Sequence, residues 1–147
     1  MTKAAVKFLQ AYIKEMMDLG GQNLPKAISA ELGAKLGKMY QKKDILTFGK
    51  GLKKMYKVLN GKTKILKIDD KTYDITIKYQ RNFCPIGGHY NPQFAKQFQE
   101  SVCTPYTLGF LTSYDATKKY KGDIEKCIIS GGGSYCKYIL HIEEKQQ

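Results

Sequence analysis

One change in hydrophobic period, at Asn60-Gly61, constrains the fold of this chain more than any other feature. Before it, apolar residues recur at steps of three and four, which is typical of amphipathic helices. After it, apolar and polar residues alternate, which is typical of half-buried strands. Because no strand–helix–strand crossover pattern follows, we predict antiparallel strands with helices massed against one face of the sheet.

Three helices are predicted before the change of period. The first covers residues 2–19 and ends at Gly20-Gly21. The second begins near Asn23, and the third runs from Asp44, a favoured N-cap residue, to Leu59. The predicted apolar stripe of the second helix consists of Ile28, Leu32, Leu36 and Met39.

Gly33 and Gly37 lie four residues apart and therefore on one side of the second predicted helix. The missing side chains allow another backbone to approach this side closely. A contact between two copies of the chain and a tight crossing inside one copy would both use it.

A first hairpin and a further helix follow. Strands over 63–68 and 72–79 are predicted to pair around a turn at Asp69-Asp70. The next apolar residues follow helical spacing over 94–110, a helix that Pro105 must kink or restart.

A second hairpin is predicted at the end of the chain. Its strands cover 123–130 and 135–143, and Gly131-Gly132-Gly133 form the turn. The 147 residues are thus predicted to be a single α+β domain, residues 1–147. The expected architecture is an antiparallel four-stranded sheet with helices packed on one face, in the order ααα-ββ-α-ββ.

The first 20 residues indicate in which cellular compartment the protein is expected. Lys3, Lys7, Lys14, Glu15 and Asp18 interrupt this stretch, so it is neither a signal-peptide core nor a membrane span. We therefore expect a cytoplasmic protein, in which thiols stay reduced. Reduced thiols favour metal ligands or buried thiols over disulfides for the four cysteines.

The net charge of +12 comes almost wholly from lysine. Arg81 is the only arginine, and bidentate recognition of guanine or phosphate relies on the planar guanidinium group. Sequence-specific nucleic-acid binding is therefore not expected. Weak contact with a polyanion or an anionic membrane surface stays open, as does a plain solvated surface.

The last cysteines are predicted to face one another. If residues 131 and 132 form the tip of the final hairpin, Cys127 and Cys136 lie opposite each other across two strands. Cys103 reaches the same point if its helix packs on the sheet. These thiols could bind zinc, form a cross-strand disulfide or stay buried and free. The candidates for a fourth zinc ligand are Cys84, His89 and Glu125.

The segments 103–111 and 125–138 resemble the C-terminal signature of the 4-vinyl reductase domain family. Cys103 opens a helix that carries a Gly-Phe pair, and Cys127 and Cys136 bracket a glycine-rich turn. The resemblance implies a hydrocarbon-binding sensor fold, often dimeric and related to the small subunits of TRAPP-type vesicle-tethering complexes. It also implies that these three cysteines and an acidic residue hold zinc, although Glu125 is one position away from the family's acidic ligand.

An aromatic helix completes the predicted site. Because ligand pockets are mainly apolar, four of its residues are expected to line a pocket for an apolar, hydrocarbon or lipid-like ligand. The same residues would also suit a plain core. With a structural zinc, such a domain would act as a sensor or adaptor and is expected to form a homodimer. The four aromatic residues are Phe94, Phe98, Tyr106 and Phe110.

Two other functions stay open from the sequence alone. The first is an enzyme, either reductase-like or zinc-dependent with His89 as a base. The chain has no dinucleotide-binding glycine fingerprint, nucleophile elbow or HExxH motif, so catalysis is less favoured. The second is a dimeric scaffold, for which Gly33 and Gly37 would provide a contact.

Overall fold

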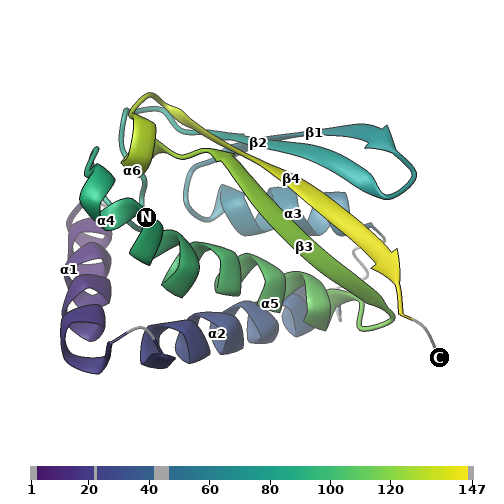
Figure 1. Ribbon diagram of the computed structural model, residues 1–147, viewed down its shortest axis with the longest axis horizontal. Helices are drawn as coiled ribbons and strands as arrows, with labels where there is room; N and C mark the ends of the chain where they lie inside the picture. Colours follow the sequence, from purple (N-terminus) through teal and green to yellow (C-terminus); the bar gives the residue numbers. More distant parts are fainter. Residues whose placement is uncertain (1–2, 22, 42–46, 146–147) are drawn as a thin grey trace.

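One four-stranded sheet, with helices packed against one face, forms the frame of the protein (Figure 1). The computed structural model describes residues 3–21, 23–41 and 47–145. All neighbouring strands are antiparallel, which confirms the predicted sheet and the α+β class. In spatial order the strands are β1 (Lys62–Asp69), β2 (Thr72–Lys78), β4 (Tyr135–Glu144) and β3 (Lys118–Lys126).

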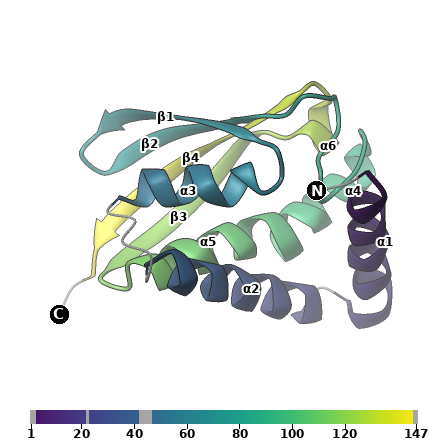
Figure 2. The same cartoon turned by 180° about the vertical axis from the view of Figure 1, so that it is seen from behind.

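Three helices precede the sheet, as predicted: α1 (Lys3–Gly20), α2 (Asn23–Gln41) and α3 (Phe48–Lys57). Thr47 caps α3, because its side-chain oxygen accepts a hydrogen bond from the Lys50 amide at 3.3 Å. The predicted cap at Asp44 lies outside the described residues. In Figure 2, α3 lies under β1 and β2, and α1 stands across one end of α2.

The buried side of α2 corrects the predicted apolar stripe. Leu32 and Met39 of that stripe are 56% and 45% exposed. The helix instead turns inward a row of mostly small residues spaced by three or four. These residues are Pro25, Ser29, Gly33, Gly37 and Tyr40.

Glycines bring the backbone of α2 against that of α5 (Thr104–Tyr114). Side chains at Gly33 and Gly37 would collide with backbone carbonyls of α5, and one at Gly109 with a carbonyl of α2. Figure 1 shows the two helices running side by side below the sheet. The glycine pair therefore serves a tight crossing inside the chain.

A helical run with a π-helical turn just before Pro105 covers the helix that Pro105 was expected to kink or restart. It consists of α4 (Pro92–Phe98), the π-helical turn η1 (Gln99–Cys103) and α5. Pro105 lies in the first turn of α5, directly after the π-helical turn. A wider turn accommodates the proline ring and the missing amide hydrogen, so the helix continues through it.

The last two strands also differ from the predicted hairpin. β3 begins at Lys118, five residues before the predicted 123, and ends at Lys126. A short helix, α6 (Ile128–Gly131), replaces the continuation of the strand. Its two isoleucines are fully buried, so the chain turns inward here. Two glycines with φ of 76° and 86° then lead into β4.

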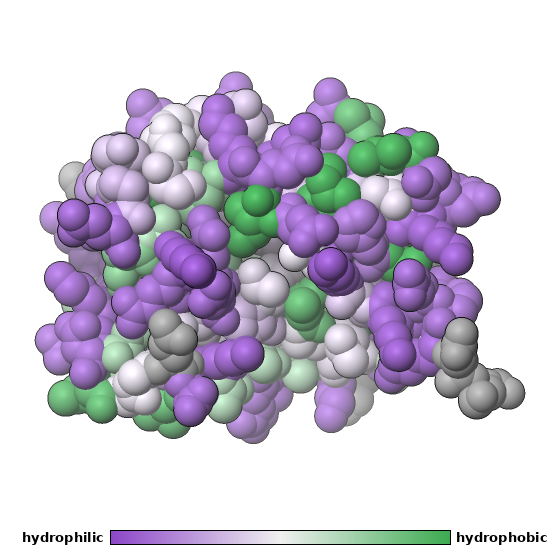
Figure 3. Space-filling view, in the orientation of Figure 1, coloured by the Kyte–Doolittle hydropathy of each residue, from purple (hydrophilic) through white to green (hydrophobic). Residues whose placement is uncertain are grey.

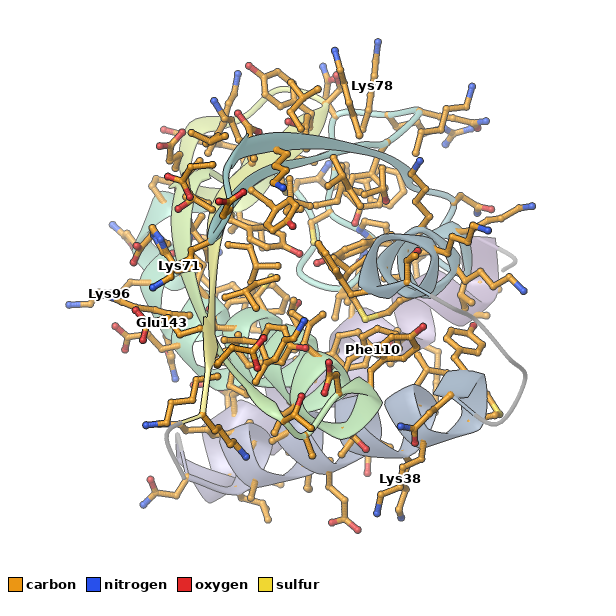
Figure 4. All side chains as sticks on the ribbon, turned by 90° about the vertical axis from the view of Figure 1, so that its right-hand side faces the viewer. Lys38, Lys71, Lys78, Lys96, Phe110 and Glu143 are labelled. Carbon is orange, nitrogen blue, oxygen red and sulfur yellow. The ribbon has the colours of Figure 1, made fainter. Side chains whose placement is uncertain are left out.

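The core fills the space between the sheet and the helices. Phe110 lies inside it, and the labelled lysines point outward (Figure 4). Its ring contacts those of Tyr40 and Tyr114, with centroid distances of 6.0 and 5.9 Å. Hydrophilic residues cover most of the face in Figure 3. No helix in the described part of the chain is long and apolar enough to cross a membrane.

Candidate functional site

An apolar cavity of about 70 Å³ lies between the sheet and the run from η1 to α5. Ile77 of β2 and Ile124 of β3 form part of its sheet side, and Tyr106 of α5 part of its helix side. All four cysteines of the chain line this cavity. The fold thus gathers thiols from a loop, a helical run and the ends of two strands.

The thiols of Cys127 and Cys136 lie together at one end of the sheet. Lys126 pairs with Lys137 in antiparallel register, so residues 127 and 136 are the next facing positions. Cys127 keeps an extended backbone, with φ −135° and ψ 134°, before α6 begins. The Cys136 thiol hydrogen-bonds to the Cys127 sulfur. The facing arrangement predicted from the sequence therefore exists, although a short helix joins the strands.

Two other elements position Cys103 and Cys84. Cys103 ends η1 and borders the cavity from the helix side. Cys84 lies in a tight loop, in which it exchanges two backbone hydrogen bonds with Gly88, at 2.8 and 2.9 Å. The Gly87 amide donates to the Cys84 sulfur at 3.3 Å. Gln10 of α1 ties the loop down by donating to the Cys84 carbonyl at 3.2 Å.

Hydrogen bonds distinguish Cys127 from the other thiols. Donation by Cys136, helped by the Gln99 side chain and two backbone amides of α6, lowers the pKa of Cys127 to about 5. The same thiol contact raises the pKa of Cys136. Burial raises the pKa of Cys103 and of Cys84. Of the four thiols, that of Cys127 is therefore the most readily deprotonated.

Three hydroxyl groups in the cavity wall satisfy one another. The Tyr56 hydroxyl lies 3.2 Å from the Thr107 hydroxyl and 3.1 Å from the Tyr138 hydroxyl. Burial raises the pKa of Tyr56 and of Tyr138, so both phenols stay neutral. Pairing leaves these three hydroxyl groups satisfied within a cavity wall that is otherwise mainly apolar.

The predicted zinc ligands divide between the cavity and the protein surface. In the described part of the chain, no three His, Cys, Asp or Glu side chains are placed to hold a metal. Glu125 is exposed and does not line the cavity; its carboxylate lies 3.3 Å from the Lys137 ammonium. His89 is exposed and packs beside Phe83, outside the cavity. The structure gathers the four cysteines but neither of the other two candidates.

The predicted aromatic ligand-binding residues separate into cavity and core. Of the four, Tyr106 lines the cavity. Phe98 and Phe110 are fully buried in the core, and Phe94 packs on Phe98 with a centroid distance of 5.7 Å. Helical spacing identified the inward side of the helix, which faces the core over most of its length. Strand alternation was a better guide to cavity-lining residues, because it predicts that Ile77 points inward, and Ile77 lines the cavity.

Comparisons with known proteins place the fold. No protein-family model matches the sequence, and no curated protein matches it. The structure is similar to that of a trafficking protein particle complex subunit 3 from Naegleria fowleri, covalently bound to palmitic acid. The TM-score is 0.66 at 10% sequence identity, over 98% of this chain and 96% of that chain. The chain therefore has the fold of a TRAPP-type small subunit, as the sequence resemblance implied.

Proposed function

We propose that this chain is a binding domain for apolar, lipid-like molecules, and that the ligand occupies the thiol-lined cavity. The observation that carries the proposal is a mainly apolar cavity wall, in which the hydroxyl groups of Tyr56, Thr107 and Tyr138 are paired with one another. A hydrocarbon segment that enters such a site leaves water, which contributes roughly 25 cal/mol per Å² of apolar surface. The palmitic acid bound by the similar subunit supports a lipid-like ligand.

The size of the cavity limits what binds without rearrangement. Its volume of about 70 Å³ is small beside the roughly 300–1,000 Å³ of most ligand pockets. A short apolar group fits the cavity as it stands. A long acyl chain requires the lining side chains to move apart, as in sites that open when a ligand binds.

Gly122 allows the proposal to be tested without damage to the fold. It lines the cavity from β3, and a Cβ there would meet only the Tyr138 ring, at 3.9 Å. Its φ is not positive, so a larger residue suits its backbone. Gly122→Leu is therefore expected to fill the cavity. Lys121→Leu is the matched control, because strand alternation points that side chain away from the cavity.

The experiment is a titration of delipidated protein with cis-parinaric acid, a fatty acid whose fluorescence increases in apolar surroundings. We expect saturable binding to the natural chain and to Lys121→Leu. Gly122→Leu should bind at least about tenfold more weakly, which corresponds to roughly 1.4 kcal/mol. Absence of binding to the folded natural chain would refute the proposal, and so would unchanged affinity in Gly122→Leu.

Membership of a particular protein family is also a proposal. We infer kinship with the 4-vinyl reductase family from the cysteine and glycine pattern of residues 103–138, and with it a cytoplasmic sensor or adaptor that forms a homodimer. The similar subunit belongs to a multi-protein complex, which supports assembly with other chains. The zinc ion and the weak contact with anionic surfaces stay predictions from the sequence. Native mass spectrometry tests the metal and the dimer together.

A further inference from the structure

We propose that Cys127 and Cys136 form a redox-active dithiol, which a hydroperoxide oxidises to an intramolecular disulfide in the cavity wall. The first support is the strand register. Because Lys126 pairs with Lys137, the two cysteines occupy the next facing positions. Facing residues of antiparallel strands have Cα atoms roughly 4.5–5.5 Å apart, within the usual disulfide range of about 4.4–6.8 Å.

The surroundings of Cys127 suit it to react first. The Cys136 thiol, the Gln99 side chain and two backbone amides of α6 all hydrogen-bond to its sulfur. These donors hold the sulfur in place and stabilise negative charge on it, and the charged sulfur is the nucleophile in thiol chemistry. Cys84 and Cys103 lie on separate elements and lack such a facing partner in the sheet.

A small oxidant has room at this site. A cavity of about 70 Å³ is several times larger than the space that one water molecule requires, roughly 10–15 Å³ by the same measure. Hydrogen peroxide is only slightly larger than water. The cavity, which both cysteines line, can therefore hold a hydrogen peroxide molecule beside them.

The chemistry balances in two steps. Cys127 loses its proton to solvent and attacks one oxygen of the peroxide as a thiolate. The O–O bond breaks, and the departing hydroxide takes a proton from solvent and leaves as water, with Cys127 as a sulfenic acid. The Cys136 sulfur then attacks the Cys127 sulfur, the S–O bond breaks, and the second oxygen leaves as water with the Cys136 proton. Two thiols are oxidised and one hydrogen peroxide is reduced to two waters. The product removes both thiols from the cavity wall.

The proposal does not depend on ligand binding, and its test uses the full chain without lipid. Folded protein is treated with hydrogen peroxide, alkylated and mapped by peptide mass spectrometry, before and after dithiothreitol. In the natural chain and in a Cys84→Ser/Cys103→Ser double variant, we expect two thiols to be lost and then restored. The mapped disulfide should join residues 127 and 136.

Single variants separate the two steps. Cys136→Ser should lose one thiol instead of two and hold Cys127 as a sulfenic acid, which dimedone labels. Cys127→Ser should keep its remaining thiols under the same treatment. Circular dichroism checks that each variant is folded, and the disulfide mapped in the natural chain gives a readout independent of the variants.

Three outcomes would overturn the proposal. The first is a disulfide that contains Cys84 or Cys103 in place of the facing pair. The second is loss of no thiols from the folded chain when the urea-unfolded chain reacts. The third is protection of Cys103, Cys127 and Cys136 together until a chelator is added, because that pattern indicates a bound metal ion.

Discussion

The two sides of α5 show opposite kinds of packing. Toward α2, Gly33, Gly37 and Gly109 bring two backbones together with no space for a methyl group. Toward the sheet, Tyr106 and Thr107 border a cavity of about 70 Å³. The same helix is therefore close-packed on one side and borders a cavity on the other. We therefore expect stability to depend mainly on the first side, whereas the second borders the cavity that we propose as the ligand site.

The largest expected effect tests the tight side. Gly33→Ala places a Cβ against the Tyr106 carbonyl and within 2.9 Å of the Phe110 amide nitrogen, and these backbone atoms cannot rotate away. We expect the free energy of unfolding to fall by about 1–3 kcal/mol, although alanine favours a helix by roughly 1 kcal/mol. Urea denaturation measures the change.

Gly131→Ala is the matched control for this substitution. A Cβ at Gly131 would meet no atom within 4 Å, so its effect should stay within about 0.5 kcal/mol. Equal stability of Gly33→Ala and the natural chain would show that the two helices are not in backbone contact, and the contrast between the two sides of α5 would disappear.

A smaller effect is expected on the cavity side. Tyr56→Phe removes the hydroxyl that contacts those of Thr107 and Tyr138, and leaves both without this partner. Loss of a buried hydrogen bond of this kind should lower the free energy of unfolding by about 1 kcal/mol. Tyr90→Phe is the control, because Tyr90 is 59% exposed. If both variants unfold at the same urea concentration, the hydroxyl cluster does not stabilise the cavity wall.

The smallest effect concerns the outer face of the sheet. Glu125→Gln weakens an exposed ion pair with Lys137, so the free energy of unfolding should change by no more than about 0.5 kcal/mol. Metal content, measured by native mass spectrometry, should not change. Glu143→Gln, another exposed carboxylate of the sheet, is the control. A loss of bound zinc in Glu125→Gln but not in Glu143→Gln would show that Glu125 is a zinc ligand.

Local patterns predicted most of the elements but misplaced several boundaries. The start of β3 was missed because the Lys118 to Gly122 segment is polar and glycine-containing, and only its pairing with β4 makes it a strand. The end of β3 was predicted too late, because Ile128 and Ile129 suit a strand as well as a buried helical turn. In both places, tertiary contacts overrode local propensity.

The candidate site was predicted only in part, because its arrangement also depends on tertiary contacts. The register of Cys127 with Cys136 follows from the period of two in strands, which depends on sequence distance alone. The position of Glu125 also depends on a register shift in β3 between Ile124 and Lys126, and the period of two by itself does not reveal such a shift. Phe110 was assigned to a pocket because helical spacing identifies an inward side without distinguishing a filled space from an empty one.

The sequence by itself determined the type and order of the helices and strands, the antiparallel sheet, and the facing of the last two cysteines. These features follow from backbone periodicity and short-range connections, which residue spacing reports directly. Only the tertiary structure decided that α2 packs through glycines, that all four cysteines share one cavity, and that Glu125 lies outside it. Those outcomes depend on how whole elements fill space against one another, which no local pattern encodes.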